Sequence, residues 1–474
     1  MAPSNERHTV QSEQALSTQQ SYSETPAPRK VVAALAASRV VLEDVFGPIA
    51  SRRFAVRFWD GTVDEPAEEP RFTLVLESPG ALRRMLLPPS ELSLTESYIF
   101  GDVDVEGSLE AATELGDVAA SRLRSPVAML RLARHVMALP RDPERTALDA
   151  AARQTPTSRR LSGRRHSKRR DREAVRFHYN VGNAFYGLWL DARMVYSCGY
   201  FAHEDDDLDQ AQESKLDLIC RKLRLAPGDR LLDIGCGWGG LIIHAAKRYG
   251  AIALGITLSE AQAELARERV AAAGLSDRCR VEIRDYRQLA SEPAFDKIAS
   301  VGMVEHVGLK RLNEYFAAAF AALRPGGLFL NHGIVSVEAS RPESLGARVA
   351  ARLWRRGMFI DRYVFPDGEL VASASVIAGA ERSGFELRDV ESLREHYALT
   401  LRHWIRNLEA RRREAVALVG EATYRVWRLY MSASANAFGS GRIGIIQSLL
   451  AKPHVDGRVE LPRTREDLYA RPSS

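Results

Sequence analysis

The sequence contains few cysteines, and their spacing suits neither disulfide bonds nor a metal site. The 474 residues include only Cys198, Cys220, Cys236 and Cys279, and no two of them form a CxxC motif. Nothing in the first thirty residues resembles a secretory signal peptide. We therefore expect a cytoplasmic protein that has reduced thiols and no metal centre.

Long apolar runs are also missing. The most apolar stretch, residues 31–50, is interrupted by Arg39, Glu43 and Asp44. A helix that spans a membrane needs about 20 apolar residues in succession. Any contact of this chain with a membrane is therefore expected to be peripheral.

The net charge of +5 is not spread over the chain. Residues 159–172 hold eight cations and one anion, so this basic segment carries +7 and the rest of the chain −2. Such a segment is either a solvated tether or an attachment to anionic lipid headgroups. In an attachment, each cation near the lipid surface contributes about 1 kcal/mol to the binding free energy. Because no aromatic residues that could stack on bases lie among the cations, nucleic acid is not expected as a partner. The cations are Arg159, Arg160, Arg164, Arg165, Lys168, Arg169, Arg170 and Arg172.

Composition along the chain divides it into four parts. The first, residues 1–30, is rich in Ser, Gln, Glu and Pro and is expected to be a disordered tail. Apolar periodicity over residues 31–140 predicts a small α+β domain. Residues 141–172 lose that periodicity and are predicted to be a basic linker. The remainder, residues 173–474, is long enough for a catalytic domain.

The third quarter of the chain alternates between strand and helix patterns. Repeated strand–helix–strand units predict an α/β fold, with a doubly wound parallel sheet whose ligands lie beyond the carboxyl ends of the strands. Expected strands cover residues 230–234, 251–257, 280–284, 295–303 and 328–335, and expected helices cover residues 240–249, 259–273 and 309–323.

A glycine-rich turn follows the first of these strands. Residues 233–240 read Asp-Ile-Gly-Cys-Gly-Trp-Gly-Gly, and glycines permit a sharp turn and close approach of the backbone to a ligand. The spacing differs from that of dinucleotide-binding loops, and Thr257 ends the second strand where those proteins carry an acid. The loop resembles motif I of class I S-adenosylmethionine-dependent methyltransferases. A tight turn without a ligand is the alternative.

Two residues near this loop have a structural as well as a functional interpretation. The Cys236 thiol is expected to be a small buried packing group. Gln262 completes a capping box with Ser259 at a helix start, and it also fits a cofactor contact. Both roles of Gln262 are compatible, because each needs this helix end beside the ligand.

Five further motifs carry a more specific resemblance. They occupy residues 178–186, 194–201, 305–308, 365–369 and 396–397. Together with the glycine loop they resemble the cyclopropane-fatty-acyl-phospholipid synthase family, which includes the mycolic acid cyclopropane synthases. The similarity extends over about residues 31–452. It implies a Rossmann-like catalytic domain with a helical lipid-binding cap formed by helices at residues 391–413 and 421–437.

The resemblance implies a reaction on membrane lipids. Members of the family transfer the methyl group of S-adenosylmethionine to a cis double bond of an unsaturated phospholipid acyl chain, and proton loss from the resulting carbocation closes a cyclopropane ring. A bound bicarbonate is implied as the base, and it is held by Cys198, Glu305, His332, the backbone of Ile334, and Tyr397. The S-adenosylmethionine site is implied to comprise Tyr196, Ser197, Asp233, Gly235, Cys236, Gly237, Gly239, Thr257, Gln262, Tyr286 and Arg287.

Strand order agrees with this assignment of the base site. Glu305 follows the fourth expected strand and His332 lies at the end of the fifth, so both belong at one edge of the sheet. Histidine and tyrosine can donate hydrogen bonds to an anion. A carboxylate such as Glu305 is compatible with a neighbouring anion only if it orients a donor or accepts the bicarbonate proton. Faces of aromatic rings can stabilise a cation, and the candidates are Tyr179, Phe185, Tyr186, Tyr196 and Tyr200.

Some features leave alternatives open. Many relatives carry cysteine where this chain has Ser434, so a mechanism that needs a thiol there is not expected. The N-terminal domain is implied to handle lipid and to pair subunits into a homodimer, at the inner face of the membrane. Alternative functions are a lipid methyltransferase with a methyl- or methylene-branched product, a small-molecule or RNA methyltransferase, and a lipid-binding protein without activity.

Overall fold

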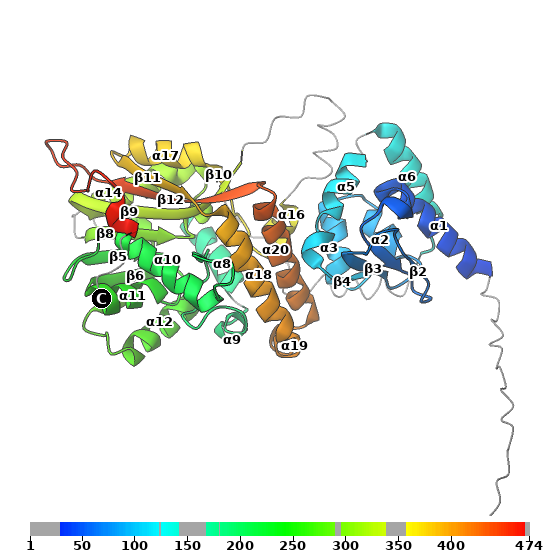
Figure 1. Cartoon of the computed structure of the whole chain (residues 1–474), viewed down its shortest axis with the longest axis horizontal. Coiled ribbons are helices and arrows are strands. Elements are labelled where there is room, and N and C mark those ends of the chain that lie inside the picture. The colour runs from blue at the N-terminus through cyan, green and yellow to red at the C-terminus, as the bar shows by residue number, and fades with distance from the viewer. Residues whose placement is uncertain are drawn as a thin grey trace, which may run out of the picture.

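The computed structural model describes residues 29–122, 125–141, 167–179, 181–289, 295–337 and 357–469. The expected N-terminal tail, apart from its last two residues, and most of the basic linker lie outside these ranges. Figure 1 shows a smaller N-terminal unit beside a larger unit that contains the main sheet. No helix within the described ranges is long and apolar enough to cross a membrane.

The N-terminal unit is an α+β layer structure. Its sheet has the order β2-β1-β3-β4, in which β1 and β3 run parallel and the other pairs are antiparallel. Apolar residues of α1, including Val41 and Leu42, are buried in the same core as Val56 and Leu76 of the sheet. The elements are α1 (Arg29–Phe46), β1 (Ala55–Arg57), β2 (Val63–Asp64), β3 (Phe72–Leu76), α2 (Ala81–Leu86), α3 (Glu91–Ile99), β4 (Val103–Gly107), α4 (Leu109–Ala112), α5 (Leu115–Arg122) and α6 (Pro126–Ala138).

The larger unit confirms the predicted doubly wound α/β sheet. Its main path has the order β11-β12-β9-β8-β5-β6-β7, and β10 pairs with β9. The five expected strands are present and parallel to their neighbours among them: β5 (Arg230–Ile234), β6 (Ile252–Thr257), β7 (Cys279–Ile283), β8 (Phe295–Val301) and β9 (Leu323–Ser336). Helices α11 (Gly240–Tyr249), α12 (Glu260–Ala272) and α14 (Leu312–Ala322) connect them.

The sequence predicted helices of the cap beyond residue 336 but did not predict strands there. This region also supplies β10 (Val371–Ala372), β11 (Glu386–Ser392) and β12 (Ile443–Ala451), and β12 lies antiparallel between β9 and β11. All but the first residue of β12 are buried, because both faces of the strand are covered. A continuously buried strand shows no polar alternation, so its sequence pattern is ambiguous.

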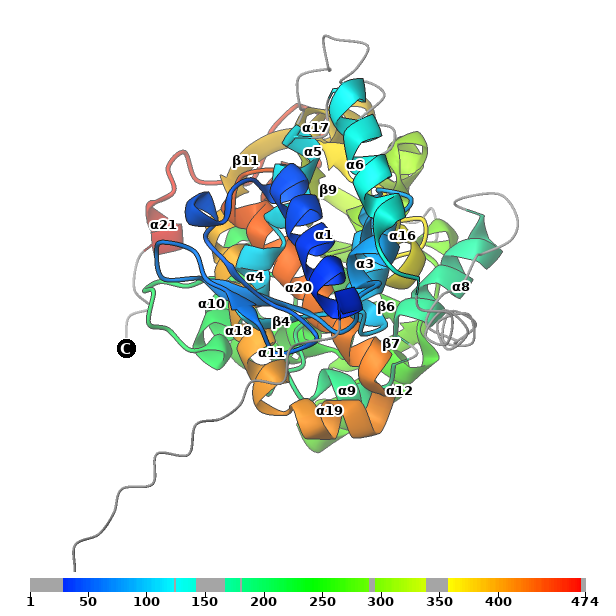
Figure 2. The same cartoon turned by 90° about the vertical axis from the view of Figure 1, so that its right-hand side faces the viewer.

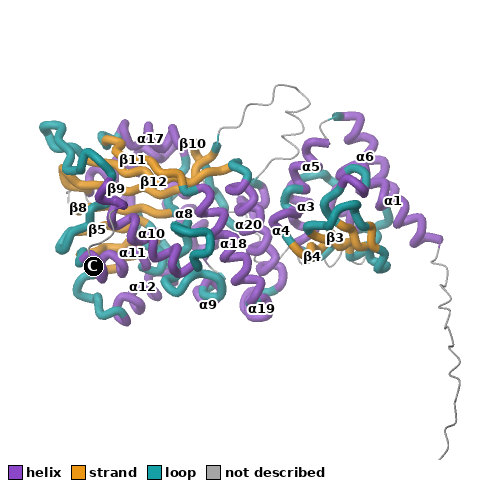
Figure 3. Tube along the Cα trace, viewed as in Figure 1, coloured by secondary structure: helices purple, strands orange, loops and turns teal. Residues whose placement is uncertain are grey.

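The remaining helices cover the sheet or form the cap. They are α8 (Lys168–Tyr179), α9 (Asn183–Tyr186), α10 (Leu208–Lys222), α13 (Val304–Val307), α16 (Met358–Tyr363), α17 (Ser373–Arg382), α18 (Arg394–Ala410), α19 (Arg412–Val419), α20 (Glu421–Gly439) and α21 (Glu466–Tyr469). Helices α18, α19 and α20 stand between the two sets of strands (Figure 3). The cap is therefore also the layer against which the N-terminal unit packs.

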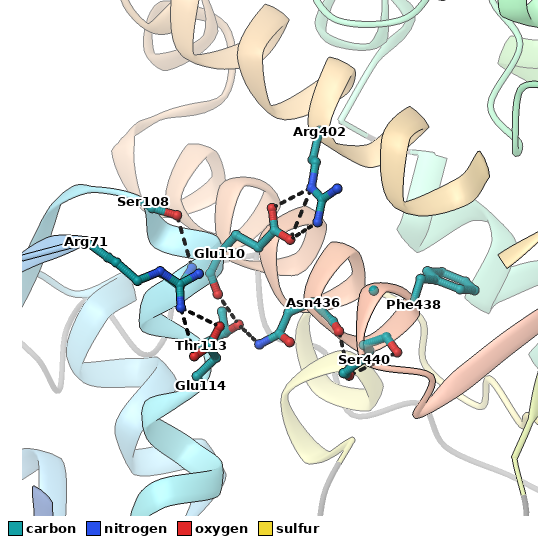
Figure 4. A network of polar contacts seen from close by, with 12 residues as sticks. Arg71, Ser108, Glu110, Thr113, Glu114, Arg402, Asn436, Phe438 and Ser440 are labelled. Atoms are coloured by element: carbon teal, nitrogen blue, oxygen red, sulfur yellow. Dashed lines mark hydrogen bonds and ion pairs between the residues drawn. The ribbon is translucent and has the colours of Figure 1, made fainter. Parts of the chain in front are cut away.

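Polar contacts join the N-terminal unit to the cap. Seen from the N-terminal side, α20 lies behind this unit, close to α3 and α4 (Figure 2). Arg402 of α18 pairs with Glu110 of α4 at 2.7 Å, and the Asn436 side-chain amide donates to the Thr113 hydroxyl at 2.7 Å (Figure 4). Arg425 pairs with Asp104 at 2.9 Å. These contacts hold in place the two helices that carry Tyr397 and Ser434.

Candidate active site

The glycine-rich loop between β5 and α11 has a backbone that only glycine adopts readily. Gly235, Gly237 and Gly239 have φ values of +84°, +53° and +82°. A Cβ atom added to Gly235 would meet Met303, whereas one added to Gly237 would meet no atom within 4 Å. Gly237 therefore borders open space.

That open space is a cavity at the carboxyl end of the sheet, where the strand order predicts a ligand. The predicted cofactor residue Gly239, which is the N-cap of α11, is not among the lining residues, and a Cβ added to it would meet Ala266 and Ile242. His306, which was not among the predicted site residues, also lines the cavity. The predicted cofactor residues that line it are Tyr196, Ser197, Asp233, Gly235, Cys236, Gly237, Thr257, Gln262, Tyr286 and Arg287.

Gln262 forms only half of the expected capping box, and its side chain lies where a cofactor contact was expected. Its backbone N–H donates to the Ser259 hydroxyl at 3.3 Å, which caps α12. Its side-chain oxygen lies 2.9 Å from the Thr257 hydroxyl, and both residues line the cavity. Cys236 is buried as predicted, and a Cβ added to Gly255 would lie 2.7 Å from its sulfur. The Cys236 thiol thus fills space beneath the loop.

Sequence reasoning missed a buried cation in the cavity wall. Lys215 of α10 is 1% exposed, and its ammonium donates to the Ser197 hydroxyl at 2.8 Å. Burial lowers the pKa of Lys215 to about 8, although the nearby Asp191, Cys198 and Asp233 oppose that shift. Burial also raises the pKa of Asp233 to about 7. A lysine in an amphipathic helix is ordinarily solvent-exposed, so the pattern gave no signal for this position.

Glu305 and Ile334 come together at the end of the sheet, as the strand order predicted. The Ile334 N–H donates to Glu305 Oε1 at 2.7 Å. Because Glu305 occupies this N–H, the Ile334 backbone holds the carboxyl group rather than facing an anion directly. Glu305 Oε2 is buried and has no hydrogen-bond partner among the described residues. Burial raises the pKa of Glu305 to about 7, although the Ile334 N–H favours the charged form.

The other three predicted catalytic residues are buried as well. His332 is fully buried; its Nδ1 lies 3.0 Å from the Gln447 amide nitrogen, and its Nε2 has no partner among the described residues. Burial raises the pKa of the Cys198 thiol and of the Tyr397 phenol well above their ordinary values, so both groups keep their protons. Both are therefore hydrogen-bond donors.

The five predicted catalytic residues lie outside the lining of the cofactor cavity but next to it. Ser197, Met303 and His306, which flank Cys198 and Glu305 in the chain, do line the cavity. Charges on Cys198 and Glu305 would both affect the titration of Tyr397. Cys198, Tyr397 and the Glu305 carboxyl thus lie near one another beside the cavity, and the cavity-lining Lys215 lies near His332.

Aromatic rings enclose this region. Tyr186 and Tyr196 lie 5.4 Å apart, and Tyr196 lies 5.3 Å from Trp404. Tyr179 and Phe185 belong to the same cluster, whereas Tyr200 stacks on His396 at 4.8 Å. Sequence reasoning missed Trp404, Trp427 and Tyr430, because they come from the cap helices α18 and α20. Ser434 is buried on α20, one turn after Tyr430.

Part of the basic segment is used inside the protein. The Arg170 guanidinium forms a two-point pair with the Asp367 carboxylate, in which one N–O distance is 2.7 Å. Asp171 pairs with Arg287 at 3.0 Å. Because Asp171, Asp367 and Arg287 line the cavity, helix α8 closes part of the cofactor site. Arg170 is thus committed to this pair, and the expectation that it contributes to a solvated or lipid-binding patch was wrong.

Comparisons with known proteins agree with this geometry. A family model described as mycolic acid cyclopropane synthetase matches residues 166–448, and a model described as a domain of unknown function matches residues 41–120. A probable fatty acid methyltransferase of Pseudomonas putida is 43% identical over 87% of this chain and 95% of its own length. A protein of the same description from Mycobacterium tuberculosis is 38% identical over 82% of this chain and 89% of its own length.

Two solved structures resemble the larger unit. The cyclopropane synthase MmaA2 from Mycobacterium tuberculosis is 35% identical, with a TM-score of 0.55 over 59% of this chain and 98% of its own. The mycolic acid cyclopropane synthase CmaA1, complexed with SAH and CTAB, is 34% identical, with a TM-score of 0.55 over 59% of this chain and 97% of its own.

Proposed function

Because the chain belongs to the mycolic acid cyclopropane synthetase family of S-adenosylmethionine-dependent methyltransferases, we propose that it forms a cyclopropane ring on the cis double bond of an unsaturated phospholipid acyl chain. The observation that carries this proposal is the pair of unpartnered buried atoms, Glu305 Oε2 and His332 Nε2. The Glu305 carboxyl is close enough to the aromatic cluster for its charge to raise the pKa of Tyr179, Tyr397 and Tyr430, and His332 is close enough to the cavity-lining Lys215 for that charge to lower its pKa. A methyltransferase that does not remove a proton from a lipid cation has little use for such a pair.

The cavity residues hold and orient the cofactor. S-adenosylmethionine, when bound, supplies an electrophilic methyl group. The Gly237 backbone allows the ligand to approach closely, and Thr257 and Gln262 present polar groups at the end of β6. The Lys215 ammonium lies behind the Ser197 hydroxyl and provides a positive charge at this end of the cavity.

The aromatic enclosure excludes water and faces the reacting carbon atoms. A carbocation forms on the lipid once the double bond is methylated, and water would capture it. Ring faces such as those of Tyr186, Tyr196 and Trp404 can each stabilise a desolvated cation by roughly 2 kcal/mol. The enclosure therefore favours a cation that persists until its proton is lost.

The polar residues beyond the cavity fit a small hydrogen-bonding anion. Bicarbonate, when bound, supplies a base between the lipid and these residues. His332 and Tyr397 would donate hydrogen bonds to it, and Cys198 would do so by turning its S–H away from the Gly199 carbonyl, which lies 3.2 Å from its sulfur. Glu305 would accept its hydroxyl proton, a role that suits a carboxyl group beside an anion, and its pKa of about 7 fits proton exchange at neutral pH. Ile334 positions Glu305 through its N–H.

Lipid analysis tests the product. We expect expression of the protein in a host with unsaturated phospholipids to add the mass of one methylene group to the acyl chains, to remove the olefinic signal and to give cyclopropane proton resonances. Mass spectrometry and proton NMR of the extracted lipid measure these changes. A matched strain that expresses Gly237→Val serves as the control. A methyl- or methylene-branched product would instead support the alternative lipid methyltransferase, and unchanged lipids would contradict both.

We further propose that the basic segment attaches the protein to anionic lipid headgroups at the membrane surface. Changing Arg164, Arg165, Lys168 and Arg169 to Gln should weaken binding to anionic vesicles by up to about 10³-fold at low salt, since each of the four cations adds about 1 kcal/mol. Arg170 is left intact because it pairs with Asp367. Co-sedimentation with anionic and with neutral vesicles measures the effect. Equal binding of both proteins to anionic vesicles would identify the segment as a solvated tether.

A further inference from the structure

A chain of buried polar residues begins at His332 Nδ1, on the opposite side of the ring from the unpartnered Nε2. His332 of β9, Gln447 of β12 and Lys222 of α10 are 0%, 0% and 1% exposed. The first two are directly opposite in the antiparallel pair of β9 and β12. Three separate elements thus bring their side chains together in the interior, where each polar group requires a partner.

Lys222 determines how the Gln447 amide is oriented. The Lys222 ammonium lies 2.8 Å from Gln447 Oε1, pairs with the Glu391 carboxylate and lies 3.8 Å from Asp389. A lysine ammonium can only donate, so the Gln447 atom facing it must be the carbonyl oxygen. The opposite orientation of the amide would place N–H groups against a buried cation. The oxygen and nitrogen of a glutamine amide are difficult to tell apart, but here the contact with Lys222 identifies which atom is which.

The amide orientation in turn assigns the histidine. The Gln447 NH₂ group lies 3.0 Å from His332 Nδ1 and can only donate to it. His332 Nδ1 must therefore carry a lone pair, and a neutral imidazole then has its proton on Nε2. Burial, together with the charges of Lys215 and Lys222, lowers the pKa of His332 well below its ordinary value, so the ring remains neutral.

We propose that Gln447 and Lys222 are positioning residues that fix His332 as the Nε2–H tautomer, so that His332 is a permanent hydrogen-bond donor and never accepts the proton released by the lipid. The catalytic part of this inference rests on the proposed function, whereas the tautomer itself does not. Since Nε2 already carries a proton, it can hold an anion in place but cannot act as a base. The acceptor must then be on the side of Glu305.

The change Gln447→Glu tests the tautomer. A carboxylate has no N–H group and can only accept hydrogen bonds. It can still accept one from Lys222, but it accepts one from His332 only if the histidine proton moves to Nδ1. We expect ¹⁵N NMR of histidine-labelled protein to show a protonated Nε2 for His332 in the unmodified protein and a protonated Nδ1 in the variant. The signal that disappears in His332→Gln identifies the residue. The kcat on lipid should fall by about 10²- to 10⁴-fold, as for other catalytic histidines held in the wrong tautomer. The affinity for S-adenosylmethionine should stay within about twofold, because His332, Gln447 and Lys222 do not line the cavity.

A neighbouring variant separates this role from simple disruption of the core. Ser448 follows Gln447 on β12, is 1% exposed and donates to the Asn331 carbonyl at 3.2 Å. Ser448→Ala should keep both the Nε2–H signal and kcat. If Gln447→Glu does not fold, Gln447→Met removes the donor to Nδ1 without adding charge and should give a mixture of both tautomers.

The outcomes are distinct. A protonated Nδ1 on His332 of the unmodified protein would overturn the inference, as would an Nε2–H signal that persists in Gln447→Glu and Gln447→Met. A reversed tautomer with unchanged kcat would overturn the positioning role. If the unmodified protein alkylates no lipid, the proposed function fails, and the spectra alone decide the tautomer.

Discussion

Replacing Glu305 by glutamine is expected to slow ring closure by about 10²- to 10⁴-fold, the usual effect of removing a positioned proton acceptor. Glutamine keeps the size of the side chain and can still accept the Ile334 N–H, which lies 2.7 Å from Oε1. It cannot take up a proton, whereas Glu305, with a pKa of about 7, exchanges one readily. Affinity for S-adenosylmethionine should remain nearly unchanged, because Glu305 lies outside the cavity lining.

His332→Gln complements this variant by removing the imidazole while it keeps a hydrogen-bond donor. Rates are measured on unsaturated phospholipid vesicles, in bicarbonate-depleted buffer and after bicarbonate is added. Added bicarbonate should partly restore a variant that binds the anion weakly, and His332→Gln is expected to respond in this way. Glu305→Gln should respond less, since its defect concerns the proton.

Glu96→Gln is the matched control for Glu305→Gln. Glu96 is also buried, at 8% exposure, and accepts a hydrogen bond from the Tyr363 hydroxyl at 2.7 Å, but it belongs to the N-terminal unit. We expect it to retain close to the unmodified rate. If Glu305→Gln and His332→Gln both work at the unmodified rate without bicarbonate, another group takes the proton and the base site is wrong.

Gly237→Val is expected to abolish binding of S-adenosylmethionine, with an affinity loss of about 100-fold or more. Two effects act together. The backbone at Gly237 has a φ of +53°, which costs a non-glycine residue about 1–2 kcal/mol and a β-branched residue more. In addition, a side chain at this position projects into the open cavity, where the ligand must lie. Calorimetry on the folded variant measures the affinity.

Gly274→Val separates strain from occlusion. Gly274 follows α12, has a φ of +68°, and a Cβ there would also meet no atom within 4 Å, but it is absent from the cavity lining. Both variants should lose similar stability in thermal unfolding, and only Gly237→Val should lose the cofactor. Undiminished affinity in folded Gly237→Val would refute the assignment of the loop.

The sequence predicted the parts of the site that depend on local signals. The strand that ends at Ile234, the glycines after it and the capping residue Ser259 are each recognisable within a few residues, because a sharp turn and a helix start impose their own residue types. The pairing of Glu305 with Ile334 followed from topology, since parallel strands end at the same edge of a sheet. The motifs of the family added Cys198 and Tyr397, which no periodicity would have singled out.

Packing between distant segments determined the rest. Lys215 and Lys222 point inward only because α10 lies against the sheet beside Asp233 and Gln447, and in sequence both lysines read as ordinary surface cations. Arg170 likewise resembled a member of a solvated run, yet Asp367, nearly 200 residues away, holds it at the cavity.

The sequence alone thus determined the fold class, the cofactor loop and the family, because these depend on short-range periodicity, turn geometry and motifs of adjacent residues. Only the tertiary structure decided the protonation states on which the chemistry depends: the neutral, oriented His332, the Glu305 carboxyl with a pKa of about 7, and the protonated Cys198 thiol. The physical reason is that desolvation and hydrogen bonding act through space, so a pKa or a tautomer is a property of the surroundings that folding assembles and not of the residue itself.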